Sequence, residues 1–312
     1  MYYYSTNKQA AKATLEEAVI KGLASDKGLF MPETIKRLPD AFYHNIGEMT
    51  FQEMSFIVAE AFFGEDVEAD ILKEIVYDTL NFDTPLVHVH DNIYSLELFH
   101  GPTLAFKDVG GRFMARLLGH FIRKKGEKEV NVLVATSGDT GSAVANGFLG
   151  VPGIRVFVLY PKGKVSEIQE KQFTTLGQNI TALEVDGTFD DCQSLVKEAF
   201  MDKELNKALL LTSANSINVA RFLPQSFYYF YAYAQMVKAG KINMGDEINF
   251  TVPTGNFGNI LAGFYAKNMG LPVKQLICAS NDNKVLFDFF STGVYDINRD
   301  FIVTVSPSMD IL

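Results

Sequence analysis

The chain has 312 residues and an apolar fraction of 47%, which predicts a large core in two domains, or one large domain with a smaller attached unit. Its formal net charge of −9 is spread along the chain and argues against a nucleic-acid partner, which would need concentrated lysine and arginine. No apolar run reaches the roughly twenty residues that cross a bilayer, so we expect a soluble protein with no membrane partner.

The first residues of the chain and its two cysteines indicate in which cellular compartment the protein is expected. The first residues, MYYYSTNKQA, lack the basic start and apolar run of a secretory signal. Cys192 and Cys278 lie far apart and form no metal or redox motif, so we interpret both as buried small apolar residues. Such low cysteine use is typical of a reducing compartment, and we expect a cytoplasmic protein. No metal site is expected either, because His88 and His90 share one strand face without a third ligand nearby.

Residues 1–85 form the first predicted unit. The opening YYYST suggests a strand, residues 15–23 a short helix, and GLFMP a turn into an extended segment. Apolar spacing predicts two further helices over 51–63 and 67–80, with Thr50 as the N-cap of the first. We find no cluster of catalytic residue types in this unit.

From residue 86 onward, strand patterns alternate with helix patterns. The strands are expected at 86–89, 94–98, 130–135, 155–159, 180–185, 208–212, 247–252 and 273–279, and the helices near 108–124, 141–149, 165–176, 189–201, 218–239 and 258–269. Nearly continuous apolar strands such as VNVLVA are typical of sheets covered on both faces. The alternation therefore predicts an α/β fold with a parallel sheet and helices on both sides. The last residues, FIVTVSPSMDIL, look like the start of an unfinished segment, and we expect a C-terminal part to be missing.

The stretch HGPTLAFKD, residues 100–108, raises the question of what its lysine does. Lys107 follows an apolar run directly and stands where a strand pattern gives way to a helix pattern. In a partly dry pocket, desolvation would disfavour the ammonium and lower the pKa of this amine. A neutral amine is a nucleophile that can form a Schiff base with an aldehyde. The alternative is a lysine that begins a helix with its charge in water, as most lysines do.

Three polar loops are each expected between a strand and a helix, where ligands of parallel sheets gather. In ATSGDTGSA, 135–143, free N–H groups at a helix start suit a carboxylate. In PTGNFGN, 253–259, glycines three apart can form a backbone nest around a phosphate. In TSANSIN, 212–218, the polar residues are uncharged, and Arg221 one turn later could face an anion. The alternatives are capped helices, tight turns and, for Arg221, a surface salt bridge.

A lysine, a carboxylate nest and a phosphate nest together suggest one cofactor. Pyridoxal 5′-phosphate has an aldehyde for the amine of Lys107, a phosphate for the nest, and a ring for apolar packing. Neither GxxxxGK[ST] nor GxGxxG occurs at these loops, so a nucleotide is not indicated.

These stretches resemble the motifs of one protein family, and they occur in the same order and with the same spacing. HGPTLAFKD, with GGRFMARLLG after it, closely resembles the threonine synthases, as do ATSGDTGSAVA, LYPKGKVSEIQEKQ, TSANSINVARFLPQ and PTGNFGNILAG. The N-terminal YYSTN and GLASDKGLFMPE match too, so the resemblance covers essentially all 312 residues. It implies the fold-type-II pyridoxal-phosphate architecture, also seen in the tryptophan synthase β subunit. Residues 1–85 would be the N-terminal unit and 86–312 the catalytic region, with a small open-sheet subdomain at about 110–215 and a large subdomain from the flanking segments.

The resemblance also implies roles for single residues. Lys107 would be the catalytic, Schiff-base lysine, with Phe106 near the cofactor ring. The cofactor phosphate would be held by the backbone of Gly255, Asn256, Phe257, Gly258 and Asn259. The substrate carboxylate and the ring oxygen of the cofactor would be faced by Ser137, Gly138, Asp139 and Thr140. The substrate's own phosphate would be bound from among Asn215, Ser216, Asn218, Arg221, Arg112 and Lys164.

The implied reaction converts O-phospho-L-homoserine and water to L-threonine and phosphate, a carbon–oxygen lyase step of amino-acid biosynthesis in the aspartate-family pathway. We expect a monomer or homodimer. A serine/threonine dehydratase or sulfhydrylase of the same fold is one alternative, and it would need no second phosphate pocket. A catalytically inactive fragment or homologue is another, because family members run past the end of this chain, and the missing part would contain the partner of the pyridine nitrogen.

Overall fold

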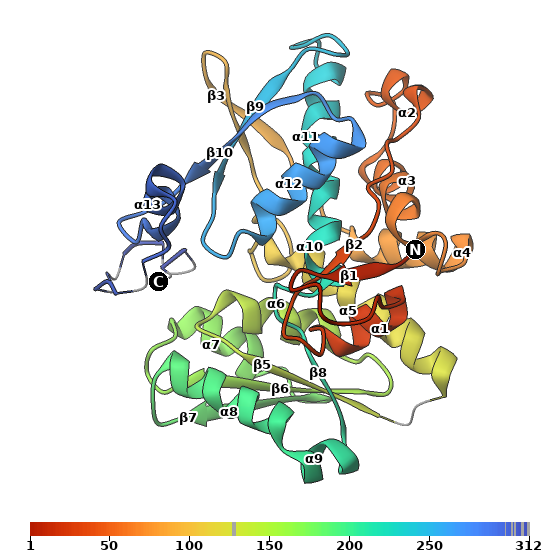
Figure 1. The fold of residues 1–312 in the computed structure, drawn as a ribbon. Coiled ribbons are helices and arrows are strands. Elements are labelled where there is room, and N and C mark those ends of the chain that lie inside the picture. The colour runs from red at the N-terminus through yellow and green to blue at the C-terminus, as the bar shows by residue number, and fades with distance from the viewer. Residues whose placement is uncertain (127–128, 297, 301, 303, 307–308, 311–312) are drawn as a thin grey trace.

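The computed structural model describes residues 1–126, 129–296, 298–300, 302, 304–306 and 309–310. In Figure 1 a four-stranded sheet fills the lower half, two shorter sheets stand above it, and the N-terminal elements run down one side. In the described part of the chain, no helix is long and apolar enough to span a membrane.

The N-terminal elements pack against the long helices of the remaining chain. They are β1 (Tyr3–Ser5), α1 (Leu15–Lys21), β2 (Phe30–Pro32), α2 (Asp40–His44), α3 (Phe51–Phe63) and α4 (Ala69–Thr79). β1 and β2 pair antiparallel, as the strand pattern of YYYST and the extended GLFMP segment suggest. Thr50 caps α3 as expected, in a reciprocal capping box with Glu53. Helices α3 and α4 pack on α11 and α5, respectively, so their apolar faces belong to one continuous core.

The strands β3 (Leu86–His90) and β4 (Ile93–Leu96) correct one expectation. They pair antiparallel in a separate hairpin and do not join a parallel sheet. The reason is the short connection, Asp91 and Asn92, because parallel neighbours need a crossover of a dozen or more residues.

The four-stranded sheet is parallel, with the strand order β7-β6-β5-β8. Its strands are β5 (Val130–Ala135), β6 (Ile154–Pro161), β7 (Ile180–Val185) and β8 (Leu210–Ser213). The helices around it are α5 (Lys107–Lys125), α6 (Asp139–Phe148), α7 (Glu167–Thr174), α8 (Phe189–Met201) and α9 (Lys203–Ala208). The sequence did not indicate α9, a short helix capped by the side chain of Asp202, and β8 therefore starts later than expected.

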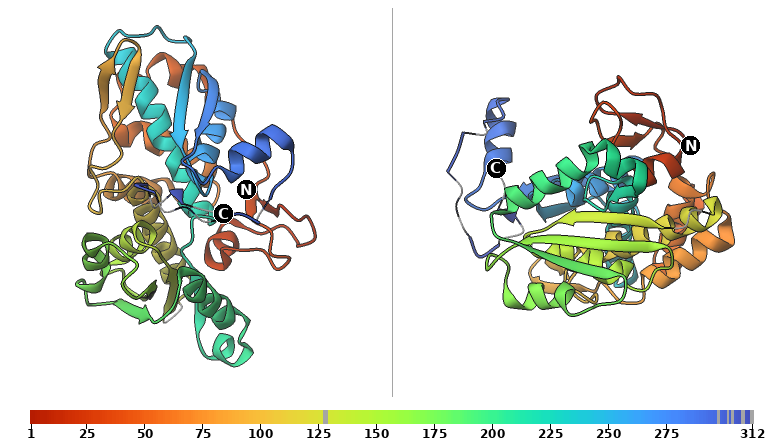
Figure 2. Two further views of the ribbon diagram at one scale, coloured as in Figure 1. Left: turned by 90° about the vertical axis from the view of Figure 1, so that its left-hand side faces the viewer. Right: turned by 90° about the horizontal axis from the view of Figure 1, so that it is seen from below.

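Helices cover both faces of this sheet (Figure 2), as the apolar strands predict. Alternate residues of a strand point to opposite faces. Val132 and Val134 of β5 belong to the main core, whereas Leu133 packs with Cys192 of α8 in a second, smaller cluster. Cys192 is thus buried as expected, and Cys278 is half-buried.

A separate parallel pair forms from β9 (Ile248–Pro253) and β10 (Val273–Ala279), joined by α12 (Gly258–Met269), so the predicted parallel strands are divided between two sheets. The helix expected over 218–239 is interrupted at Pro224, giving α10 (Val219–Phe222), the 3-10 turn η1 (Leu223–Gln225) and α11 (Ser226–Lys238). Its aromatic stripe is core, as predicted, with Phe227 and Tyr233 fully buried. The helix α13 (Val285–Thr292) follows β10.

Candidate active site

The order of the strands identifies where this sheet should bind a ligand. From β5 the chain adds β6 and then β7 on one side, and returns to add β8 on the other side of β5. Ligands of open α/β sheets bind beyond the carboxyl ends of the strands at such a reversal. The β5–α6 loop (136–138) and the β8–α10 loop (214–218) leave the two strands there, and Leu133 of β5 pairs with Ser213 of β8. Two of the three predicted loops are therefore neighbours.

Lys107 reaches this edge of the sheet as the first residue of α5. Only 9% of the residue is exposed, which contradicts the alternative of a solvated lysine. Its Nζ donates a hydrogen bond to Oδ2 of Asp139 at 3.3 Å, and it lies 5.7 Å from the ring centre of Phe106. Helix α5 packs on α6 and α10, so the lysine and both loops converge.

The turn that precedes Lys107 is fixed by the next residue, Asp108. The backbone N–H of Thr103 and its hydroxyl both donate to the carboxylate of Asp108, at 2.9 and 2.5 Å. Asp108 is fully buried, and this burial raises the pKa of its carboxyl group. The sequence analysis assigned no role to this aspartate, although its place in HGPTLAFKD was visible. The clamp sets the direction in which α5 begins.

Asp139 begins α6 and is itself held from a second side. Nε2 of Gln169 on α7 donates to its Oδ1 at 2.8 Å. Gly138 before it has a φ of +147°, and a Cβ there would lie 2.1 Å from Oε1 of Gln169. Only glycine fits this position, both because of its backbone and because Gln169 approaches so closely. The sequence analysis did not single out Gln169.

Arg221 of α10 is fully buried, so the alternative of a surface salt bridge is wrong. Its Nη1 donates to the carbonyl of Ala214 at 2.5 Å, while its Nε has no hydrogen-bond partner among the described residues. Burial lowers the pKa of Arg221 to about 10, which still leaves it cationic at neutral pH. A Cβ at Gly110 would lie 2.3 Å from the carbonyl of Arg221, so this glycine permits α5 and α10 to pack closely.

The third predicted loop, the β9–α12 loop (254–257), also approaches this place. A Cβ built at Gly258, where α12 begins, would lie 3.7 Å from the carbonyl oxygen of Ser216 in the β8–α10 loop. The side chain of Asn259 shapes the turn, accepting a hydrogen bond from Thr254 and donating one to the carbonyl of Pro253. At a helix start the first N–H groups have no carbonyl of a preceding turn to bind, so those of Gly258 and Asn259 can face an anion, whereas that of Ile260 donates to the side chain of Asn259.

The other residues expected at the substrate phosphate have their polar groups bound to backbone carbonyls or exposed to solvent. The guanidinium of Arg112 donates to the carbonyls of Asp78 and Thr79 at the end of α4. Asn218 caps α10 through its side-chain oxygen and donates to the carbonyl of Val19. Lys164 is exposed in the loop that follows β6. Six residues were expected at the substrate phosphate. Of these, Asn215, Ser216 and Arg221 lie in or next to the β8–α10 loop and keep donors for which the structure gives no backbone carbonyl among the described residues.

The surroundings of Lys107 favour its neutral amine. Desolvation lowers the pKa of Lys107 most strongly, Asp139 opposes this effect by stabilising the ammonium, and the charge of Arg221 adds to the lowering. A neutral amine at this position can act as a nucleophile or accept a proton.

Replacing Lys107 by methionine is expected to stabilise the fold at neutral pH by about 1–2 kcal/mol, since a desolvated charge is exchanged for an apolar side chain of similar size. The folded pKa of Lys107 lies below its unfolded value, so the unfolded chain binds more protons between the two values, and wild-type stability rises with pH over that window. Urea unfolding at pH 7 and pH 10 measures this, and the advantage of Lys107→Met should shrink at pH 10. A variant less stable than wild type at pH 7 would contradict the expectation.

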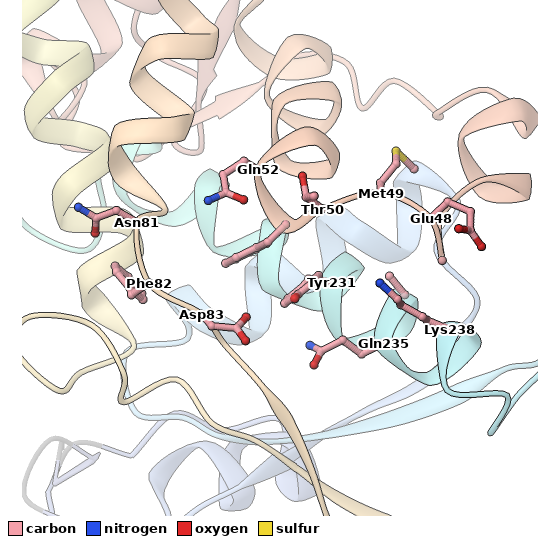
Figure 3. Close-up of a pocket in the computed structure, with 13 residues that line it drawn as sticks. Glu48, Met49, Thr50, Gln52, Asn81, Phe82, Asp83, Tyr231, Gln235 and Lys238 are labelled. Atoms are coloured by element: carbon pink, nitrogen blue, oxygen red, sulfur yellow. The ribbon is translucent and has the colours of Figure 1, made fainter.

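A separate cavity has a volume of about 420 Å³, and neither Lys107 nor any residue of the three predicted loops lines it. Figure 3 shows that its lining comes from residues 48–52 at the start of α3, from 81–83 and from α11. Phe51 and Tyr231 stack there with ring centres 4.5 Å apart, which is a packing contact between α3 and α11. In the described ranges, no group of three or more His, Cys, Asp or Glu residues could hold a metal ion.

Comparison with known proteins identifies the family of the chain. The family model "Pyridoxal-phosphate dependent enzyme" matches residues 78–309, and "Threonine synthase N terminus" matches residues 2–80. Threonine synthase of Escherichia coli is 44% identical, over 100% of this chain and 71% of its own length. That of Schizosaccharomyces pombe is 45% identical over 99% of this chain, which spans 64% of that relative. A PLP-bound threonine synthase structure from Brucella melitensis superposes with a TM-score of 0.92 at 40% identity, covering 99% of this chain and 67% of the other.

The chain therefore belongs to the threonine synthase family of pyridoxal-phosphate-dependent enzymes. The fold-type-II architecture implied by HGPTLAFKD and the three loops is confirmed. The chain spans about two thirds of the length of the curated relatives it matches.

Proposed function

We propose that the protein to which this chain belongs is a threonine synthase, which uses pyridoxal 5′-phosphate to convert O-phospho-L-homoserine and water to L-threonine and phosphate. The observation that carries the proposal is the buried Lys107 amine at the strand-order reversal. It interacts electrostatically with the buried Arg221, whose Nε has no partner within the described ranges.

The residues present fit this cofactor. Its aldehyde requires a neutral amine, and the pKa of Lys107 is lowered by burial. Its phosphate requires N–H donors, for which we assign the backbone of the β9–α12 loop and of the start of α12, at Gly255, Asn256, Phe257, Gly258 and Asn259. Phe257 adopts a left-handed φ of 59° at the start of this helix, a conformation that non-glycine residues keep mainly where the site requires it.

A second anion site is proposed for the substrate phosphate. The Nε of Arg221 and the hydroxyl of Ser213 are buried and have no partner among the described residues. Such orphaned donors cost free energy unless a ligand satisfies them. We assign the substrate phosphate to Asn215, Ser216 and Arg221, with the exposed Lys164 as a more distant cation. Arg112 and Asn218 stay outside this site because their donors already bind backbone carbonyls.

When bound, the cofactor supplies a ring that stores the negative charge left by removal of the substrate's Cα proton. Lys107 accepts that proton as general base, and its fall in pKa suits this role near neutrality. Ser137, Gly138 and Thr140, with the first N–H groups of α6, orient the substrate carboxylate. Loss of a proton from Cβ lets the phosphate held in this site leave Cγ. A proton then adds at Cγ and water adds at Cβ, which gives the methyl and hydroxyl groups of threonine. An empty cationic site would disfavour plain homoserine.

The experiment that tests the proposal is addition of pyridoxal phosphate to this chain, followed by borohydride reduction and peptide mapping. We expect a stable pyridoxyl group on Lys107, with none of this labelling on the exposed Lys124 of the same helix. A loaded sample that has not been reduced should release phosphate from O-phospho-L-homoserine. Labelling of Lys124 and not Lys107 would overturn the assignment. Turnover of serine or threonine without phosphate release would instead indicate a dehydratase.

The location and the assembly state belong to the same proposal. Both cysteines are free, which suits a reducing cytoplasm. A monomer or homodimer remains our prediction, and light scattering of the purified protein decides between these.

A further inference from the structure

Gln169 connects α7 to the lysine through a short chain of side-chain hydrogen bonds. The hydroxyl of Ser166 donates to Oε1 of Gln169 at 3.2 Å, and Nε2 of Gln169 donates to Oδ1 of Asp139 at 2.8 Å. The other oxygen of Asp139 accepts from Lys107 at 3.3 Å. Each group in this chain has a defined direction, because the serine hydroxyl occupies the amide oxygen and leaves the amide NH₂ for the aspartate.

The backbone around Gln169 is fixed as firmly as its side chain. The carbonyl of Gln169 accepts a hydrogen bond from the hydroxyl of Ser142 on α6 at 3.2 Å. The amide oxygen would lie 2.1 Å from a Cβ at position 138, so it fills the space that the glycine leaves. Asp139 and Lys107 have side chains only 14% and 11% exposed, so water competes little for these contacts. A contact made in such surroundings is stronger than the same contact at the surface.

We propose that Gln169 is a positioning residue, which holds the Asp139 carboxylate in the orientation that faces the Lys107 amine and so sets how reactive that amine is. With its Oδ1 bound to the amide of Gln169, the Asp139 carboxylate is oriented so that Oδ2 faces the lysine. Of the charged groups around Lys107, Asp139 from α6 favours the ammonium, and Arg221 from α10 opposes it. Gln169 determines how strongly Asp139 stabilises the ammonium form of Lys107. This inference needs no cofactor or substrate, so it is independent of the proposed function.

The test measures the reactivity of Lys107 in the chain without added cofactor. Trace acetic anhydride labels neutral amines, and mass spectrometry of the peptides compares Lys107 with the exposed Lys124 across pH 6–11. Gln169→Leu keeps the size of the side chain but removes its donor. Because Asp139 then favours the ammonium less, we expect labelling of Lys107 at neutral pH to rise roughly two- to fivefold, with its titration midpoint shifted to lower pH.

Asp139→Asn removes the charge itself and should raise labelling more, by roughly tenfold. The double variant should match Asp139→Asn alone, since Gln169 acts only through the aspartate. Glu167→Gln, whose side chain on the same helix is 80% exposed, is the matched control and should label like wild type. A loosened pocket would raise labelling at all pH values without moving the midpoint. An unmoved midpoint in Gln169→Leu, or additive effects in the double variant, would overturn the proposal.

Discussion

Replacing Lys107 by alanine is expected to abolish attachment of pyridoxal phosphate at this position and to lower turnover of O-phospho-L-homoserine at least about 10³-fold. The amine is the one group at the strand-order reversal that the proposed mechanism uses both to hold the cofactor and to accept a proton. No neighbouring residue can replace it within the described site, because Arg221 stays cationic and the Asp139 carboxylate is held by Gln169. Borohydride labelling and a phosphate-release assay measure the two losses.

Two variants control this experiment. Lys107→Met also lacks the amine but is expected to be more stable than wild type, so loss of labelling in it cannot come from unfolding. Lys125→Ala removes an exposed lysine at the other end of α5, where it pairs with Glu16, and should keep both activities. Normal turnover by either Lys107 variant would show that the reaction runs elsewhere in the protein.

Replacing Arg221 by methionine is expected to weaken binding of O-phospho-L-homoserine roughly 10²-fold, since a charge-assisted contact to phosphate in a dry site is lost. Plain homoserine, which lacks the phosphate, should bind about as weakly as it does to wild type. Methionine is apolar and of similar length, and replacing a buried charge in this way is often neutral for stability. Isothermal titration of the borohydride-reduced, pyridoxyl-carrying chain with both compounds measures the difference, because this reduced form cannot turn the substrate over.

The control for Arg221 is Arg155→Met on β6, whose side chain is 62% exposed and pairs with Glu129. It should bind both compounds like wild type. An equal loss for phosphohomoserine and homoserine in Arg221→Met would mean that the arginine supports the β8–α10 loop through Ala214 without facing the phosphate.

Local patterns predicted the parts of the site that lie next to strands. Glycine-rich loops after apolar strands, and a lysine after an apolar run, were sufficient to identify the α/β class and the position of Lys107. The two-residue connection at 91–92 also indicates that β3 and β4 form a hairpin, because parallel neighbours need a longer crossover than this. Pro224 likewise marked the interruption that separates α10 from α11.

Other properties depend on packing between distant segments and could not be read locally. Arg112 and Arg221 differ in their neighbours. The end of α4 offers carbonyls to Arg112, whereas Nε of Arg221 has no acceptor among the residues that the structure describes. Gln169 looks like an ordinary polar residue of a surface helix until α7 is placed against α6. The unit boundaries at 85 and 86, and most of the individual roles, stay predictions.

The hydrogen bonds that Thr212 and Asn218 donate to Ile20 and Val19 join the two halves of the molecule at the end of α1. The two family matches meet near residue 80, as if they were separable modules. In space they are not, since the segment that carries the proposed phosphate site supplies the C-terminal cap of an N-terminal helix. Because the acceptors are backbone carbonyls, a graft of the first 80 residues from a relative should join correctly only where positions 212 and 218 keep a side-chain donor.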